Sequence, residues 1–266
     1  MPSTSADVWA SGAAYELYIG RWSRRVAPAF LTWLQCVPDA SWLDVGCGTG
    51  ALTEAIFGAA APARVHAIDA SPSYAQFARG QVRDRRATFV VADARSLPCA
   101  AHSIDIAVSG LALNFVPQPH EALAEMARVV RTGGVVAVYV WDYAGEMQLV
   151  RSFWEAAVSL DPRASQLDEA RRFPICRPAA LEELFRRAGL EGIESVAIDV
   201  PTRFRDFDDY WHPFLGGQGP APGYAMSLTE DRRIALRERI RASLPFGADG
   251  SINLIARAWA VRGTLA

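Results

Sequence analysis

The fold of this chain is decided at residues 41–50, which read Ser41-Trp42-Leu43-Asp44-Val45-Gly46-Cys47-Gly48-Thr49-Gly50. A short apolar run typical of a buried strand is followed by three closely spaced glycines. Glycine lacks a Cβ atom, so it adopts positive φ and leaves backbone N–H groups open to a ligand. Residues 51–57 have a helix-forming composition. The sequence therefore predicts a ligand at the carboxyl end of this strand, beside a helix N-terminus.

The glycine spacing alone leaves two kinds of ligand open. Gly46, Gly48 and Ala51 also satisfy the G-x-G-x-x-G/A fingerprint of dinucleotide-binding proteins. Asp44 separates the two, because its carboxylate comes two residues before the first glycine, where a pyrophosphate would approach. An anion there suits a cationic ligand better. A nicotinamide-dependent oxidoreductase is kept as the alternative, and Asp44 and Asp93 are the residues that argue against it.

The run from Leu43 to Gly50 resembles the first motif of the class I S-adenosylmethionine-dependent methyltransferases, whose cofactor carries an ammonium and a sulfonium. By motif order the resemblance covers about residues 15–200. It implies a Rossmann-like fold and S-adenosylmethionine as the cofactor. The residues of this turn that it implies as cofactor contacts are Asp44, Gly46, Cys47, Gly48 and Gly50.

Three later segments fit the same family. Asp69 ends a predicted strand at residues 64–68, nineteen residues beyond Gly50, a spacing at which an acid accepts hydrogen bonds from both ribose hydroxyls. Residues 92–98 resemble the adenine-binding loop, in which Asp93 would accept from the exocyclic amine. Residues 110–116, which follow a predicted strand at 103–109, resemble the loop that passes between cofactor and acceptor. The contacts implied here are Asp69, Ala70, Asp93, Ala94, Ser109 and Gly110 for the cofactor, and Asn114 for the acceptor.

The N-terminal region has helical periodicity from Trp9 to Leu34, with Pro28 expected to begin a second helix. Most of this apolar stripe is expected to pack on the sheet. Residues 18–22 resemble the cap segment that folds over the cofactor in small-molecule methyltransferases. The resemblance implies that Tyr18 and Arg21 contact the cofactor, with Arg21 paired to its carboxylate.

Strand and helix patterns alternate five times up to Trp141, which predicts a doubly wound α/β sheet. A helix at 119–131 is expected to end in a tight turn at 131–134, before a central strand at 135–141. The resemblance implies seven strands with an antiparallel last strand. We expect one methyltransferase domain over residues 1–266: a helical cap at 1–40, a cofactor-binding core at 41–141, and insertions at 142–177 and 201–248 that cover the substrate side.

The acceptor side is less specific. Residues 204–220 combine aromatic, acidic and glycine residues, which favours a helix and a mobile loop that close a pocket. Tyr143, Tyr210 and Trp211 are the candidate substrate contacts, although the aromatic residues also suit a small core beneath the loop. His212 lies beside this cluster and is the candidate general base.

Composition limits the partners. The net charge of −2 argues against a nucleic-acid footprint, and no run of residues is typical of a signal peptide or membrane anchor. The four cysteines form no C-x-x-C pair, and no acidic or histidine cluster has metal-ligand spacing. We expect a cytoplasmic enzyme that methylates O, N or C of a small molecule by metal-independent in-line displacement. Methylation of a protein or RNA, and a non-catalytic cofactor-binding regulatory protein, are the alternatives.

Overall fold

The computed structural model describes residues 16–217 and 219–266. The first part of the predicted N-terminal helical stretch, Trp9 to Tyr15, and Gln218 of the glycine-rich segment lie outside these residues. The chain divides into two compact units. The core unit comprises residues 22–141, 175–199 and 258–266. The accessory unit comprises, within the described residues, 16–21, 142–174 and 200–257.

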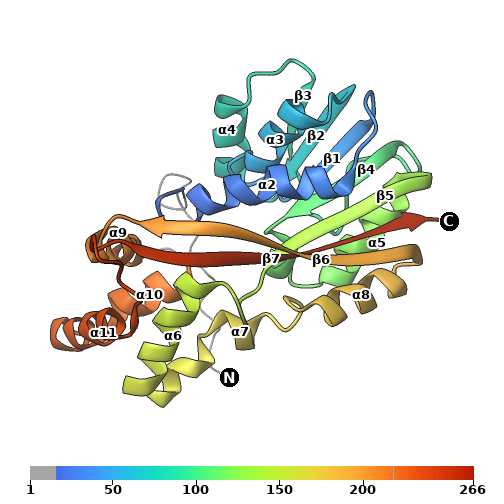
Figure 1. Cartoon of the computed structure of the whole chain (residues 1–266). Helices are drawn as coiled ribbons and strands as arrows, with labels where there is room; N and C mark the ends of the chain where they lie inside the picture. The colour runs from blue at the N-terminus through green and yellow to red at the C-terminus, as the bar shows by residue number, and fades with distance from the viewer. Residues whose placement is uncertain (1–15, 218) are drawn as a thin grey trace. The chain divides into compact units, whose positions relative to one another are not determined.

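A seven-stranded sheet has the order β3-β2-β1-β4-β5-β7-β6 (Figure 1). Its strands are β1 (Ser41–Val45), β2 (Arg64–Asp69), β3 (Ala87–Val91), β4 (Ile104–Gly110), β5 (Val130–Trp141), β6 (Leu190–Phe204) and β7 (Ile252–Leu265). The first five strands pair in parallel, and β7 runs antiparallel to β5 with Val138 opposite Val261. The predicted doubly wound sheet with an antiparallel last strand is confirmed.

β1 occupies the position that organises the core unit. All five of its residues are buried, and β2 and β4 flank it on either side. The chain leaves β1 toward β2 and β3, then returns to its other side at β4, so the strand order reverses next to β1. In open α/β sheets such a reversal opens a crevice beyond the carboxyl ends of the strands. The glycine turn lies at that place.

The helices of the core unit follow the sequence pattern closely. They are α2 (Arg21–Leu34, which begins at the last accessory residue), α3 (Ala51–Ala59), α4 (Pro72–Gln81), the short η2 (Leu113–Phe115), α5 (Pro119–Val129) and α8 (Pro178–Arg187). Ser71 caps α4, since its hydroxyl accepts from the Tyr74 N–H, and Pro72 takes the first helical position as predicted.

Two local predictions were wrong. Pro28 does not begin a helix but lies inside α2, whose buried face continues on both sides of it from Trp22 to Leu34. Packing of that continuous face outweighs the hydrogen bond that proline cannot donate. Residues 131–134 form no separate turn either, because they belong to β5. A register irregularity opposite, between Ile104 and Ile106, and the positive φ of Gly133 accommodate the longer strand.

The accessory unit is built from short helices around aromatic side chains. Its helical elements are η1 (Glu16–Gly20), α6 (Gln148–Leu160), η3 (Pro162–Gln166), α7 (Glu169–Arg172), α9 (Phe207–Trp211), η4 (His212–Gly216), α10 (Pro220–Ser227) and α11 (Glu230–Ser243). Phe153 of α6 stacks on Phe214 of η4 with ring centroids 4.6 Å apart. In the part of the chain that the structure describes, no helix is both long and apolar enough to cross a membrane.

Candidate cofactor site

The glycine turn uses its own N–H groups. Gly46 and Cys47 both donate to the Ile68 carbonyl, at 2.7 and 3.0 Å, and Gly50 donates to the Cys47 carbonyl at 2.8 Å. The Gly48 N–H donates to Asp69 Oδ2 at 2.8 Å. The expectation that the turn leaves these N–H groups open to a ligand was therefore wrong. Those of Gly46, Cys47 and Gly48 hold the turn to β2, so these N–H groups do not form the row of free amides that a pyrophosphate needs.

The glycines are required for close approach. Gly46 has φ 75°, and a Cβ atom there would lie 2.4 Å from the Cβ of Ala112 in the loop after β4. Gly48 also has positive φ, at 53°, but a Cβ atom there would meet nothing within 4 Å. Space is therefore open beside the backbone of Gly48, whereas the far side of the turn is closed by Ala112. A ligand group fits against Gly48.

Asp44 is the buried acid of the turn. Its carboxylate is fully buried, and Oδ2 accepts a 2.6 Å hydrogen bond from the Thr53 hydroxyl in the first turn of α3. Oδ1 has no hydrogen-bond partner. Burial raises the pKa of Asp44 to about 7, the nearby Asp69 carboxylate raises it further, and the Thr53 hydrogen bond opposes both. A buried carboxylate oxygen without a donor fits a cationic or N–H-bearing ligand group.

Asp69 ends β2 next to the turn. One carboxylate oxygen accepts from the Gly48 N–H and the other from the Ser71 N–H, both at 2.8 Å. Burial raises the pKa of Asp69, and these two backbone hydrogen bonds oppose that shift. Each carboxylate oxygen has a second lone pair for a ligand hydroxyl. Ala70, the next predicted contact, is exposed.

Asp93 is held differently from the other two acids. Arg95 Nη2 lies 2.6 Å from Asp93 Oδ2, Arg95 Nε donates to both carboxylate oxygens, and the Arg95 backbone N–H donates to Oδ1 at 2.9 Å. These hydrogen bonds lower the pKa of Asp93 to about 2. The same guanidinium also donates to Gln118, which precedes α5. The amine of an adenine would therefore have to share the Asp93 carboxylate with Arg95. Ala94, which lies between these two residues, is half-buried and would offer its backbone groups to the adenine.

The loop after β4 closes the opposite side of the turn. Ser109 is buried, and Gly110 has no room for a side chain because a Cβ atom would lie 2.5 Å from the Tyr139 hydroxyl. Leu111 has φ 58°, the left-handed region that few non-glycine residues adopt. Asn114 in η2 is buried, and its Nδ2 has no hydrogen-bond partner. A strained backbone and an unpaired buried amide at one strand end are typical of a ligand-binding loop.

The remaining predicted residues belong to the accessory unit. Tyr18 of η1 is buried and stands edge-on to Phe214, with ring centroids 5.4 Å apart. Arg21 Nη1 pairs with Asp209 Oδ1 at 3.1 Å, and its guanidinium lies over the Phe204 ring. Within the described residues, Asp209 is thus a carboxylate partner of Arg21.

The predicted substrate contacts and base differ in exposure. Tyr143 is buried beside Phe173. Tyr210 is buried, and its hydroxyl donates to the Leu149 carbonyl at 2.9 Å. Trp211 stacks on Phe207. Tyr210 and Trp211 thus contribute to the aromatic core of this unit, whereas His212 is exposed at the start of η4.

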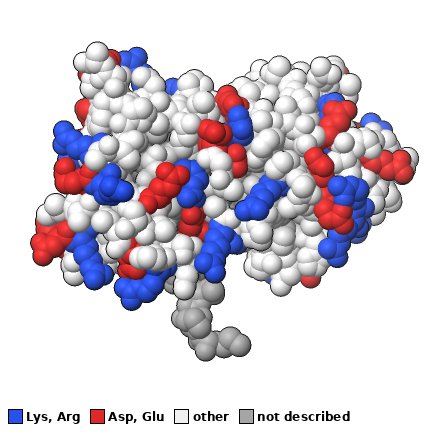
Figure 2. All heavy atoms as spheres, turned by 60° about the horizontal axis from the view of Figure 1, so that its bottom comes forward, with Lys and Arg blue, Asp and Glu red and all other residues white. Residues whose placement is uncertain are grey.

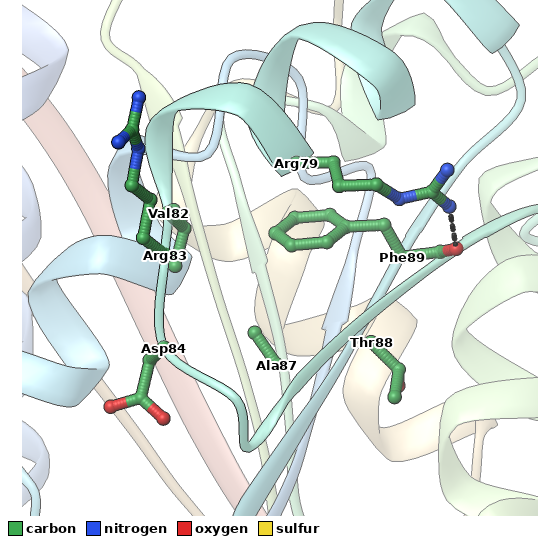
Figure 3. A pocket seen from close by; sticks show the side chains of 7 residues that line it. All are labelled: Arg79, Val82, Arg83, Asp84, Ala87, Thr88 and Phe89. Atoms are coloured by element: carbon green, nitrogen blue, oxygen red, sulfur yellow. Dashed lines mark hydrogen bonds between the residues drawn. The ribbon is translucent and has the colours of Figure 1, made fainter.

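A surface pocket of about 420 Å³ lies elsewhere in the core unit (Figure 3). Val82, Ala87 and Phe89 are among the residues that line it, and Arg79, which lines it as well, donates to the Phe89 carbonyl at 2.7 Å. The pocket lies where β3 begins, whereas the glycine turn follows the carboxyl end of β1. Val82 and Phe89 of this pocket belong to the same buried cluster as Cys47 of the glycine turn. Within the described residues no group of three or more His, Cys, Asp and Glu residues is placed to hold a metal ion.

Several residues of the site were missed from the sequence. One of them is Thr53, which could have been predicted from the sequence. A hydroxyl in the first turn of the helix that follows the glycines can reach back to a side chain of β1. The other two are Ala112, which packs against Gly46, and Arg95, which is paired with Asp93. Their positions depend on how the loops fold on one another. Their spacing in the sequence gives no signal of that kind.

Comparison with known proteins agrees with this geometry. Residues 43–138 match a family described as a methyltransferase domain. The chain is 34% identical over 127 residues to the malonyl-[acyl-carrier protein] O-methyltransferase of Hahella chejuensis, a match that covers 47% of this chain and 44% of that protein. It is 28% identical over 206 residues to the demethylmenaquinone methyltransferase of Roseiflexus sp., covering 65% of this chain and 84% of that protein.

Solved structures share the fold. Phosphoethanolamine N-methyltransferase 2 of Haemonchus contortus, in complex with phosphomonomethylethanolamine and S-adenosylhomocysteine, aligns with a TM-score of 0.57 at 17% identity. That alignment covers 96% of this chain and 56% of the other, and at such identity it shows the fold alone. The chain spans about half the length of the malonyl-[acyl-carrier protein] O-methyltransferases that it matches.

Proposed function

Since the chain belongs to the class I S-adenosylmethionine-dependent methyltransferases, we propose that it transfers the cofactor's methyl group to O, N or C of a small organic molecule. The observation that carries this proposal is the buried Asp44 carboxylate, whose Oδ1 has no partner. A buried anion of this kind is costly unless a ligand pairs with it. The ammonium of S-adenosylmethionine meets that need.

The same region argues against a dinucleotide. A pyrophosphate is bound by free amides at a helix N-terminus. Here the N–H groups of Gly46, Cys47, Gly48 and Gly50 are all used within the protein. A second anion beside Asp44 would also raise the electrostatic cost of its ionisation. The nicotinamide-dependent alternative is disfavoured on both grounds.

We assign the cofactor to the carboxyl ends of β1 to β4. Asp44 would pair with the ammonium of the cofactor. The chain of the cofactor would lie along the open side of Gly48, and Asp69 would accept hydrogen bonds from the ribose hydroxyls. Ala94 and Asp93, with Arg95 behind it, would face the adenine, and the loop at Ser109 and Gly110 would border the sulfur. When bound, the cofactor supplies an electrophilic methyl group on a sulfonium.

The acceptor is proposed to be a small molecule. The relatives named above are a malonyl-[acyl-carrier protein] O-methyltransferase and a demethylmenaquinone methyltransferase, and the second of these names supports a small-molecule acceptor. The surface supports it as well, because arginines and acidic side chains are interspersed on the face drawn in Figure 2 and the net charge is −2. Binding of RNA favours a continuous basic surface instead.

Methyl transfer from a sulfonium needs few catalytic groups. The leaving group is neutral, so the protein chiefly has to hold the acceptor in line and exclude water, which lowers the barrier by roughly 7–11 kcal/mol. The insertions at residues 142–177 and 201–248 are proposed to cover the acceptor, with Tyr143, Tyr210 and Trp211 among its neighbours and His212 as the candidate base. A cytoplasmic location is proposed too, and none of the four cysteines forms a disulfide.

The test of this proposal is a transfer assay. The full chain is incubated with methyl-labelled S-adenosylmethionine and a panel of phenols, carboxylic acids, acyl thioesters and amines. Label that becomes covalently attached to one acceptor class, with stoichiometric S-adenosylhomocysteine, supports the proposal. Tight binding of S-adenosylhomocysteine with no transfer to any member would instead support a regulatory cofactor-binding protein.

A further inference from the structure

The pocket at the start of β3 is built from two neighbouring elements of the core unit (Figure 3). Arg79 lies on α4 and Val82 ends that helix, while Ala87, Thr88 and Phe89 come from β3. We call it the β3 pocket. Its volume of about 420 Å³ falls within the range of about 300–1,000 Å³ that small-molecule sites have. The pocket is therefore large enough to hold a small ring-bearing ligand.

Part of the lining of the β3 pocket is apolar and firmly packed. Val82 and Phe89 are both buried, and they belong to a cluster whose other buried members are Cys47, Ala67 and Ala78. Figure 3 shows the Phe89 ring pointing toward Val82. Because side chains packed in this way keep their rotamers, they offer a ligand a fixed apolar surface. A flat aromatic body suits such a surface.

Two guanidinium groups line the same pocket without a carboxylate partner. Arg79 Nη2 donates to the Phe89 carbonyl at 2.7 Å, which holds the Arg79 guanidinium in place but leaves its charge unpaired. Arg83 is exposed, and within the described residues its side chain forms neither a hydrogen bond nor an ion pair. Guanidinium groups bind anionic oxygen atoms through parallel N–H donors. The pocket therefore favours a ligand that carries an anionic group.

The acid that lines the pocket, Asp84, does not cancel this charge, because it is already paired. Arg86 donates to both Asp84 oxygens, from Nε at 3.0 Å and from Nη2 at 2.7 Å. Figure 3 shows the Arg83 side chain turned away from Asp84. Residues 79–86 carry four arginines and this single acid, although the whole chain has a net charge of −2. The segment is therefore a local attractor of anions.

We propose that the β3 pocket is a binding site for a small aromatic anion. The ring of this ligand lies against Phe89 and Val82, and its anionic oxygens pair with Arg83 and Arg79. The inference goes beyond the proposed methyl transfer and does not depend on it.

The pocket and the glycine turn share one side chain. Val82 lines the pocket, and a Cβ atom on Gly50 would lie 3.2 Å from Val82 Cγ2. The cofactor is assigned to Asp44 and to the open side of Gly48, whereas no residue that lines the pocket is assigned to the cofactor or to the acceptor. We therefore expect the two ligands to bind to the same molecule at once.

The experiment is a calorimetric titration of the full chain with 1-naphthyl phosphate. The comparison ligands are 1-naphthol and inorganic phosphate, which carry the two parts of the probe separately. We expect 1-naphthyl phosphate to bind at least about tenfold more tightly than either, because only the whole probe uses both the apolar lining and the arginines. Saturating S-adenosylhomocysteine should leave that affinity unchanged.

Three variants locate the binding. Arg83→Gln should weaken binding of 1-naphthyl phosphate about tenfold, as loss of a charged hydrogen bond predicts. It should fold, since the Arg83 side chain has no partner in the described chain. Ala87→Leu should weaken binding at least as much, because it fills the pocket without changing its charge. Arg85→Gln is the matched control, since Arg85 is an exposed arginine of the same segment that does not line the pocket.

Several results would overturn the proposal. They are no binding of 1-naphthyl phosphate, equal affinities of wild type and Arg83→Gln, and an equal loss in Arg83→Gln and Arg85→Gln, which would show a general effect of charge. Competition between 1-naphthyl phosphate and S-adenosylhomocysteine would overturn it too, because it would place the probe at the glycine turn. Failure of the wild-type chain to bind S-adenosylhomocysteine would instead reject the proposed methyltransferase function, and the variants would still decide whether the pocket binds the probe.

Discussion

Asp44 in the core unit and Glu169 in the accessory unit are both buried carboxyl groups with a single side-chain donor. Thr53 donates to Asp44, and Trp154 donates to Glu169. Burial raises the pKa of Asp44 to about 7 and that of Glu169 to about 8. Only Asp44 was predicted from the sequence, although the two environments are alike.

The difference lies in what places each acid. Asp44 and Thr53 are nine residues apart, on a strand and the helix that directly follows it, so the glycine spacing fixes both. Glu169 accepts from Trp154, which lies fifteen residues earlier on a different helix. Local spacing predicts a site made by one strand and its turn. It does not predict a buried acid that is placed by the packing of two helices.

The largest expected effect comes from Asp44→Asn. Asparagine keeps the volume and still accepts from Thr53, but it lacks the charge that would pair with an ammonium. We expect binding of S-adenosylhomocysteine to weaken by about 2–4 kcal/mol, measured by calorimetry at pH 7.5. Glu54→Gln, an exposed acid on α3, is the control and should bind normally. Equal affinities for the Asn variant and wild type would remove Asp44 from the cofactor site.

Asp69→Ala is expected to weaken the same binding by about 1–3 kcal/mol, through lost charged hydrogen bonds. Because Asp69 also accepts from the Gly48 and Ser71 N–H groups, part of that loss reflects the turn itself. A 2′-deoxy analogue of S-adenosylhomocysteine isolates the ribose term in a double-mutant cycle. Wild type should lose affinity for the analogue and the Ala variant should not. A loss of equal size in both proteins would exclude the ribose role.

Glu169→Gln should change how stability depends on pH. A carboxyl whose pKa is raised on folding stabilises the fold fully at low pH, and that contribution is lost as the pH rises from about 4.5 to about 8. Wild type should therefore lose on the order of 1–3 kcal/mol of unfolding free energy between pH 5 and pH 9 that the Gln variant keeps. Urea denaturation at both pH values measures it. Parallel pH curves would show that Glu169 does not titrate inside the fold.

The smallest expected effect is the pH dependence of cofactor affinity. Asp44 must be ionised to pair with an ammonium, and its pKa is about 7. Affinity for S-adenosylhomocysteine should rise roughly tenfold between pH 6 and pH 7.5, with release of a proton on binding. Calorimetry in buffers of different ionisation enthalpy detects that proton. Asp44→Asn should show neither the rise nor the release, and a rise that persists in it would point to Asp69.

Much of the core unit was predictable because its signals are local. The strand at Ser41–Val45, the acid at Asp69 and the capped helix at Pro72 each follow from a few neighbouring residues. Pro28 and residues 131–134 were misread, because packing of a continuous helix face and pairing with β4 outweighed local propensity. Arg95 illustrates the limit at the site, since nothing in its spacing indicates that it occupies the carboxylate of Asp93.

The most direct test of the central claim is calorimetric titration of the wild-type chain with S-adenosylhomocysteine and, separately, with NAD. The buried Asp44 and the engaged N–H groups of Gly46, Cys47, Gly48 and Gly50 predict micromolar binding of S-adenosylhomocysteine and no binding of NAD. Binding of NAD in its place would contradict the account, because it would mean that the turn accepts a pyrophosphate beside a carboxylate.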